Sequence, residues 1–275
     1  MQPGPHRYST VLQANKGVLA ECCQLFNEAS VSYVVAGGWV PYLRGGNSSL
    51  THPGTNDVDL LLNDDCETVE KALKVLLTKG YAPSAKHQFQ LLKRLPVGGE
   101  HFVFNVDLMH PAEAEGRSEM FQDIMDLGVR EDYDPLSTRH IKSIVFPSSR
   151  IVFDEELWSM HDLEAFLPDG SRVNVPIPLM DERALILSKC KSVRSDKRDR
   201  DAFDIFFILT GPEGTSVAAD LLALGKRFPQ VQAQLDCLTD HLRTAAATFS
   251  SRVARFSDPN QLNDPAGQVL SILTQ

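Results

Sequence analysis

Cysteine is scarce in this sequence, and its spacing excludes the usual cysteine-based sites. The chain of 275 residues has five cysteines, an odd number, and two of them, Cys22 and Cys23, are adjacent. None has the paired spacing of a zinc motif, and neighbouring cysteines cannot bridge each other comfortably. We therefore expect reduced thiols in a reducing compartment, rather than a secreted domain stabilised by disulfides.

Long apolar runs are also missing. No apolar stretch approaches the roughly 18 residues that a membrane-spanning helix needs. The sequence does not begin with a basic segment followed by an apolar one, as a secretory leader would. These absences predict a soluble, cytoplasmic protein with no membrane partner.

Positive charge is in deficit, with 27 Lys and Arg residues against 36 Asp and Glu residues, for a net charge of -9. This balance argues against broad nonspecific binding to nucleic acid, because phosphate contacts need clustered cations. One stretch, 189–200, departs from it and could bind a triphosphate, an RNA end or only solvent. Its basic residues are Lys189, Lys191, Arg194, Lys197, Arg198 and Arg200.

What the sequence does contain is a pair of aspartates one residue apart, Asp57 and Asp59, in a segment that ends in three leucines. In a strand, residues i and i+2 face the same side, so both carboxylates project together while Val58 faces the other way. Hard oxygen ligands of this kind suit Mg²⁺, which is usually completed by substrate phosphates. The pair therefore indicates nucleotide chemistry on a metal ion.

A third carboxylate, Asp107, lies on the less apolar side of a later segment, 101–108, whose alternation is typical of a half-buried strand. If this strand pairs with the one that carries Asp57 and Asp59, three carboxylates share one site. Two metal ions could then hold the attacking and leaving oxygens of a displacement at phosphorus.

Two glycines, Gly37 and Gly38, follow the predicted buried strand 32–36 and precede a predicted helix over 39–43. Glycine lets the backbone turn tightly and approach a ligand closely. A helix that begins just after such a turn presents backbone N–H groups to an anion. The pattern suits a triphosphate site, although a plain turn would use the same residues.

Taken in order, Val35-Ala36-Gly37-Gly38, then Thr55-Asn56-Asp57-Val58-Asp59-Leu60, and later Asp107, resemble the nucleotidyltransferase superfamily, whose best-known member is DNA polymerase beta. Two features depart from the family pattern. Trp39 stands where many members have a phosphate-binding serine, and the loop from Gly45 to Thr55 is longer than usual.

The resemblance implies an α+β fold with a nucleotidyltransferase-type mixed β-sheet core. It also implies a role for each residue of the motif. Gly37 and Gly38 would bind the triphosphate, Asp57 and Asp59 would bind both metal ions, and Asp107 would help to activate the acceptor hydroxyl.

A second group of polar residues lies in two apolar, helix-like segments, 185–191 and 200–209. A lysine, Lys189, followed by Arg200-Asp201-Ala202-Phe203-Asp204, resembles the abortive-infection toxin branch of type IV toxin–antitoxin systems. Lys189 would offer its charge to the triphosphate, and Asp201 would orient that lysine or accept a proton. The alternative is a helix N-terminus rich in Asp because acids favour the positive end of the helix dipole.

The turn signals divide the chain into a core with a β extension over 1–178 and a helical subdomain over 179–275. The histidines near the acidic motifs, His52, His101 and His110, lack partners at metal-ligand spacing and are expected to be surface or supporting residues. Further predicted elements are helices at 10–28, 67–78 and 120–127, strands at 141–146 and 151–153, and a hairpin over 163–177.

We therefore expect a nucleotidyltransferase that uses Mg²⁺ or Mn²⁺ to move a nucleoside monophosphate from an NTP such as ATP to an acceptor hydroxyl, releasing pyrophosphate. The acceptor stays open among an RNA end (tRNA included), a protein side chain and a small molecule. One alternative is a non-catalytic nucleotide-binding module of the same fold. Another is a glycosyltransferase, which would place a Rossmann-like βα run ahead of the acidic pair, and the N-terminus does not obviously supply one.

Overall fold

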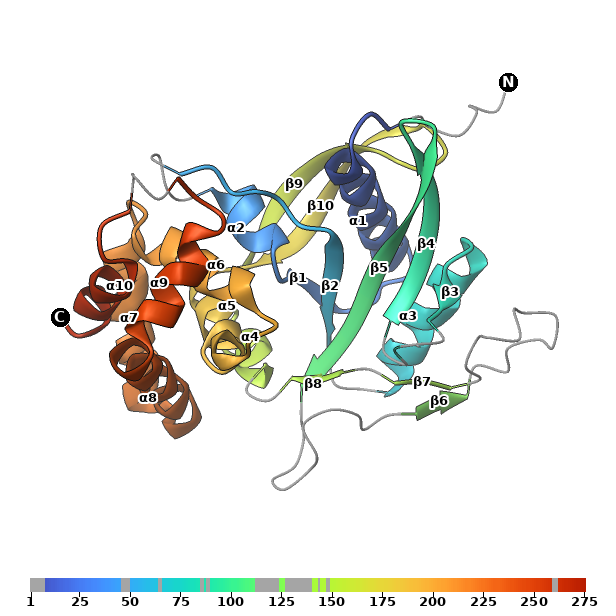
Figure 1. The fold of residues 1–275 in the computed structure, drawn as a ribbon. Helices are drawn as coiled ribbons and strands as arrows, with labels where there is room; N and C mark the ends of the chain where they lie inside the picture. The colour runs from blue at the N-terminus through green and yellow to red at the C-terminus, as the bar shows by residue number, and fades with distance from the viewer. Residues whose placement is uncertain are drawn as a thin grey trace. The chain divides into compact units, whose positions relative to one another are not determined.

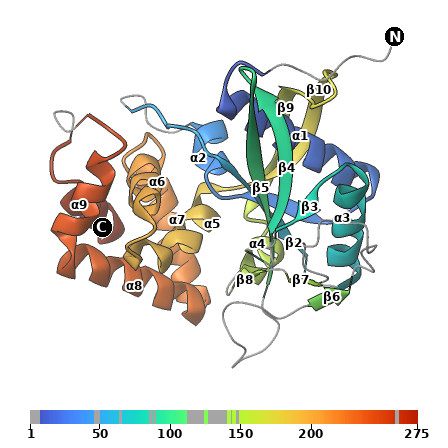
Figure 2. The ribbon, with the colours of Figure 1, turned by 45° about the vertical axis from the view of Figure 1, so that its right-hand side comes forward.

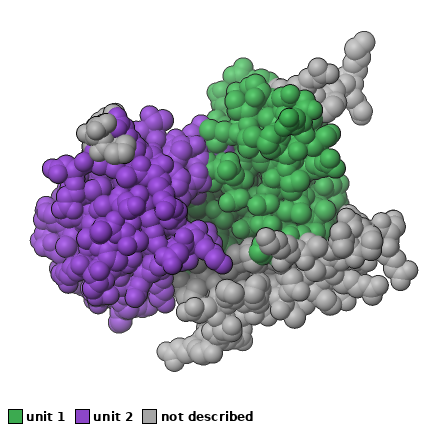
Figure 3. Space-filling view, viewed as in Figure 1, with its two compact units in different colours: residues 1–37, 55–180 green, residues 38–54, 181–275 purple. Residues whose placement is uncertain are grey.

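The computed structural model confirms an α+β protein in which helices accompany a mixed β-sheet (Figure 1). The chain divides into two compact units, residues 1–37 with 55–180, and residues 38–54 with 181–275 (Figure 3). The domains expected from the sequence, 1–178 and 179–275, stay a prediction. The observed division differs from them in assigning 38–54 to the helical unit. The structure describes residues 8–45, 50–63, 66–84, 87, 90–111, 124–126, 140–142, 144–146, 149–258 and 262–275.

The first unit is built on an eight-stranded sheet in the order β3-β4-β5-β2-β1-β10-β9, with β8 paired to the end of β5. β2 is antiparallel to β1 and parallel to β5, which makes the sheet mixed. The strands are β1 Tyr33–Ala36, β2 Asp57–Leu62, β3 Ala82–Pro83, β4 Gln90–Val97, β5 Glu100–Pro111, β8 Ile144–Phe146, β9 Trp158–Phe166 and β10 Arg172–Met180.

The two longer helices described in this unit are α1 Val11–Glu28 and α3 Cys66–Thr78, both as the sequence predicts. The Thr10 side chain caps α1 by accepting a hydrogen bond from the Gln13 N–H. α1 contacts α3 and several strands, and Figure 2 shows the long β4–β5 hairpin with α3 nearby. The apolar face of α1 explains why both cysteines, Cys22 and Cys23, are fully buried.

The predicted hairpin over 163–177 is confirmed as β9 and β10, joined by a tight turn in which Gly170 has a φ of 90°. Two other predictions are wrong. The strand expected at 151–153 is helix α4 Arg150–Asp154, because a short Ile-Val-Phe run fits a buried helical turn as well as a strand.

The helix expected at 120–127 is wrong where the structure describes it, because Ile124–Asp126 is strand β6, antiparallel to β7 His140–Lys142. The rest of that expected helix lies outside the described residues. The expected strand 141–146 falls on β7 and β8, and residue 143 between them is also outside the described residues.

The second unit is helical and buries an aromatic core around Phe203, whose ring lies 5.8 Å from that of Phe207 and 5.7 Å from that of Phe256, between centroids. Its helices are α2 Trp39–Arg44, α5 Glu182–Lys189, the 3₁₀ turn η1 Ser192–Arg194, α6 Asp199–Leu209, α7 Gly214–Arg227, α8 Pro229–Thr244, α9 Ala246–Ala254 and α10 Pro265–Leu273.

Taken one at a time, the helices that the structure describes are all too short or too polar to cross a membrane. Among these described helices, α6 and α7 taken as a pair satisfy the length and composition required of a span, and the chain bends by 106° between them.

Candidate functional site

The two aspartates of β2 lie as the strand period predicts. Asp57 and Asp59 are half-buried on one side of the strand, whereas Val58 and Leu60 on the other side are fully buried. β2 is an inner strand with β1 on one flank and β5 on the other. β5 therefore supports the backbone at both carboxylates, and β1 also supports it at Asp59.

The parallel register of β2 and β5 brings the third carboxylate to the same face. Asp59 is paired with Asp107, and Asp57 is paired with Asn105. Paired residues of neighbouring strands share a face, and their backbones lie about 4.8 Å apart. The pairing that the sequence left conditional is thus observed, and Asp57, Asp59 and Asp107 occupy one face of two adjacent strands.

Amide side chains hold two of these carboxylates. The Gln90 Nε2 on β4 donates to Asp107 Oδ1 at 2.8 Å, and the Asn105 Nδ2 donates to Asp57 Oδ1 at 3.3 Å. Neither amide was singled out from the sequence. Asn105 could have been, because it alternates with Asp107 on one strand face, but Gln90 reaches the site only through the β4–β5 pairing.

The donor set suits a hard divalent cation, because carboxylate and amide oxygens are the ligands that Mg²⁺ and Mn²⁺ prefer. In the described part of the chain, no group of three or more His, Cys, Asp or Glu side chains already converges as a metal site. The chemistry of the residues therefore fits the ion.

Gly37 lies directly against the second aspartate. Its φ is +67°, in the left-handed region, and a Cβ atom built on it would come within 1.8 Å of Asp59 Oδ2. Only glycine fits this position, so the first glycine of the motif is explained by the carboxylate it faces. Gly38 belongs to the other unit, where it precedes α2, and its predicted phosphate contact stays a prediction.

Trp39, the residue that departs from the family pattern, is the first residue of α2 and is fully buried. Its ring packs edge-on against that of Tyr42, with 5.6 Å between the centroids. The tryptophan is therefore a core residue of the helical unit.

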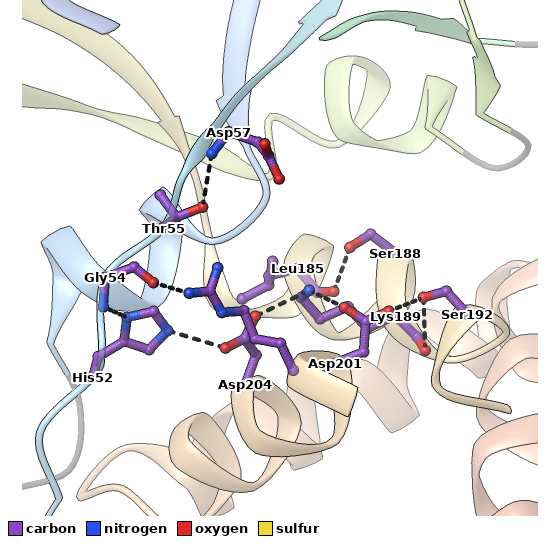
Figure 4. A network of polar contacts seen from close by, with 11 residues as sticks. His52, Gly54, Thr55, Asp57, Leu185, Ser188, Lys189, Ser192, Asp201 and Asp204 are labelled. Carbon is purple, nitrogen blue, oxygen red and sulfur yellow. Dashed lines mark hydrogen bonds and ion pairs between the residues drawn. The ribbon is translucent and has the colours of Figure 1, made fainter. Parts of the chain in front are cut away.

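The second predicted group forms a buried charge cluster within the helical unit (Figure 4). The Lys189 Nζ, at the end of α5, lies 2.5 Å from Asp201 Oδ1 and 3.0 Å from Asp204 Oδ2. The Ser192 hydroxyl donates to the other oxygen of Asp201 at 2.5 Å. The i, i+3 spacing of the two aspartates on α6 thus points both carboxylates at one ammonium.

This cluster is strongly coupled. Burial alone would lower the pKa of Lys189, but the carboxylates of Asp204 and Asp201 outweigh it and raise that pKa. Burial would raise the pKa of Asp204, but the Lys189 ammonium and the His52 hydrogen bond lower it below its usual range. The predicted nucleotide contacts of Lys189 and Asp201 stay a prediction, and the observed role of Lys189 is to neutralise two buried carboxylates.

His52 is a part of this cluster that sequence reasoning placed on the surface or in a supporting role. It is buried, its Nε2 lies 3.0 Å from Asp204 Oδ1, and its Nδ1 accepts a hydrogen bond from the Gly54 N–H at 3.1 Å. Because Nδ1 is an acceptor, the ring proton sits on Nε2 and is donated to Asp204. Arg200, on α6, donates a hydrogen bond to the carbonyl of Gly54. The loop from Gly45 to Thr55 is therefore bonded to α6 near the C-terminal end of the loop.

Two substitutions separate the two bonds of His52. Asparagine keeps an acceptor for the Gly54 N–H but is too short for Asp204, whereas glutamine keeps a donor that reaches Asp204. We expect His52→Asn to lower the free energy of unfolding by about 1–3 kcal/mol, because it leaves a buried carboxylate oxygen without its partner. His52→Gln should lose less. Urea unfolding of both variants measures the difference, and equal losses would contradict a role for the Asp204 bond.

No protein-family model and no curated protein sequence matches this chain. The resemblance to nucleotidyltransferases thus rests on the motif residues alone. Function has to be inferred from the chemistry of the site, since a fold by itself does not determine activity.

Proposed function

We propose that this protein is a metal-dependent nucleotidyltransferase of the DNA polymerase beta superfamily, which transfers a nucleoside monophosphate from an NTP to an acceptor hydroxyl and releases pyrophosphate. The observation that supports it most is the register of β2 and β5, which puts Asp57, Asp59 and Asp107 on one sheet face. A solvated strand face would not require a glycine fitted against one of the carboxylates, as Gly37 is.

In the reaction, the acceptor oxygen forms a bond to the α-phosphorus while the bond from that phosphorus to the β-phosphate oxygen breaks. Bound Mg²⁺ or Mn²⁺ would neutralise the charge that develops on the phosphate oxygens. Asp57 and Asp59 would hold the metal, and Asp107 would accept the proton of the acceptor hydroxyl. Gln90 orients Asp107 through its hydrogen bond, which keeps that carboxylate directed during the transfer.

One observation favours the non-catalytic alternative, a nucleotide-binding module of the same fold. In the residues described, Gln90 engages the Asp107 carboxylate, Asn105 engages the Asp57 carboxylate, and the acidic side chains do not converge as a metal site. A module of this kind would bind NTP and leave it intact.

Pyrophosphate release separates the two readings. The purified protein is incubated with each NTP, Mg²⁺ or Mn²⁺, and total RNA or cell lysate as acceptor, and labelled product is followed. Release that requires a metal and prefers one NTP supports nucleotidyl transfer, and the labelled product identifies the acceptor. Nucleotide binding without release under any condition supports the module.

The substitution Gly37→Ala tests whether glycine is needed to accommodate the Asp59 carboxylate. In Gly37→Ala the new Cβ displaces the Asp59 carboxylate, and we expect turnover to fall on the order of 100-fold, as for misplacement of a catalytic group by about 1 Å. Gly98→Ala is the matched control, because Gly98 also has a left-handed φ, +59°, but no atom within 4 Å of its added Cβ. Both variants share the backbone strain of about 1–2 kcal/mol, and only Gly37→Ala should lose turnover. Equal turnover in the two would contradict the proposed fit.

A further inference from the structure

Asn15 is a polar residue in the middle of a buried helix face. It lies on α1 among Ala14, Val18 and Leu19, and like them it is fully buried. Asparagine is a poor helix former, and a buried amide costs free energy unless it is hydrogen-bonded. Its presence here indicates that its hydrogen bonds matter.

Those bonds go to the start of β2. The Asn15 Nδ2 donates to the carbonyl of Thr55 at 3.0 Å and to the carbonyl of Asp57 at 3.5 Å. The orientation of the amide follows from these partners, because the reverse orientation would place its oxygen against two carbonyl oxygens. The amide nitrogen is therefore directed at the backbone that carries the first aspartate, while the amide oxygen is buried with no hydrogen-bond partner among the described residues.

These carbonyls lie at the end of β2 that β1 does not reach. β1 pairs with β2 only from Asp59 to Leu62, because Ala36, the last residue of β1, is opposite Asp59. β2 begins two residues earlier, at Asp57, where β5 is its strand neighbour and β1 has ended. Asn15 supplies, at this end of β2, hydrogen bonds of the kind that β1 supplies to the rest of the strand.

We propose that Asn15 is a positioning residue for Asp57. By holding the carbonyls of Thr55 and Asp57, it fixes the backbone where β2 extends past β1, and so fixes the direction of the Asp57 carboxylate. The proposal rests on the proposed nucleotidyl transfer for its effect on turnover. Its effect on the backbone does not depend on that activity.

The test is Asn15→Leu, which keeps the approximate volume and removes both donors. We expect kcat to fall on the order of 100-fold with little change in the KM for NTP, since the loss is in orientation at the metal side. In the metal-free protein, hydrogen exchange at the amides of Val58 and Asp59, followed by NMR, should become about tenfold faster, while that of Leu61 is unchanged.

Val18→Ala is the matched control, because it removes buried volume from the same helix without touching these bonds. If Val18→Ala lowers kcat and speeds exchange at Val58 and Asp59 as much as Asn15→Leu does at equal loss of thermal stability, the proposal is wrong. If the wild-type protein shows no turnover, the proposed function fails. The exchange comparison then still decides whether Asn15 holds the start of β2.

Discussion

Asp59→Asn is expected to reduce metal-dependent pyrophosphate release on the order of 1,000-fold or more while the fold stays intact. Asn has the size and shape of Asp, so it fits beside Gly37 as the carboxylate does. It lacks the negative charge that would neutralise a divalent cation, and an amide nitrogen in this position repels one. Because Asp59 is paired with Asp107, the loss falls at the centre of the acidic face.

The same chemical change at an exposed position provides the control. Asp162 lies on β9 in the same unit and is exposed, so Asp162→Asn should leave turnover unchanged. Circular dichroism and the urea midpoint would verify that both variants fold like the wild type. Turnover retained by a correctly folded Asp59→Asn protein would show that the metal is not held by this face, and the proposed mechanism would have to be abandoned.

Local patterns predicted the elements that build this face. The alternation of Val58 and Leu60 with the aspartates predicted β2, and the alternation along 101–108 predicted β5. Each alternation shows which side of the strand faces the core. Because this signal is local, a few consecutive residues are enough to predict the strand. The pairing of these two strands could only be assumed from the sequence. The register of the pair depends on residues about 50 positions apart, which no local pattern links.

The residues that hold the site in place were harder to predict from the sequence. Asn15 lies 40 positions before Thr55, and Gln90 lies 17 before Asp107, so their bonds exist only once the sheet has formed. His52 has no i, i+4 companion, and its partner Asp204 lies 152 positions away. The prediction from a short apolar run failed for a different reason. The segment 151–153 is too short to show the hydrophobic period that distinguishes a helical turn from a strand.

Lys189→Met is expected to lower the free energy of unfolding by about 3–5 kcal/mol, the cost of leaving buried carboxylates without their cation. Methionine keeps most of the length and apolar stem of lysine. Asp204 is fully buried and Asp201 is nearly so, and both then face each other without the ammonium that lies within 3.0 Å of each. Thermal or urea unfolding measures the loss.

Lys191→Met is the matched control, because Lys191 is two residues further along the chain and exposed, and its loss should be small. A second change tests the cause. In the Lys189→Met background, Asp204→Asn removes one of the uncompensated charges and should recover part of the stability. No recovery would mean that Lys189 stabilises the unit by packing of its stem and not by its charge.

The pH dependence of the difference between wild type and Lys189→Met follows from the two pKa shifts. The pKa of Lys189 is raised above its usual 10.5, so its contribution is complete below pH 10.5 and is lost as the pH rises through the folded pKa. The pKa of Asp204 is lowered from its usual 3.8, so its contribution is present above pH 3.8 and is lost as the pH falls through the folded pKa. The difference in unfolding free energy should therefore be largest between these two values and shrink at both extremes. A difference that stays constant from pH 2 to pH 12 would contradict an ion pair, because packing alone does not titrate.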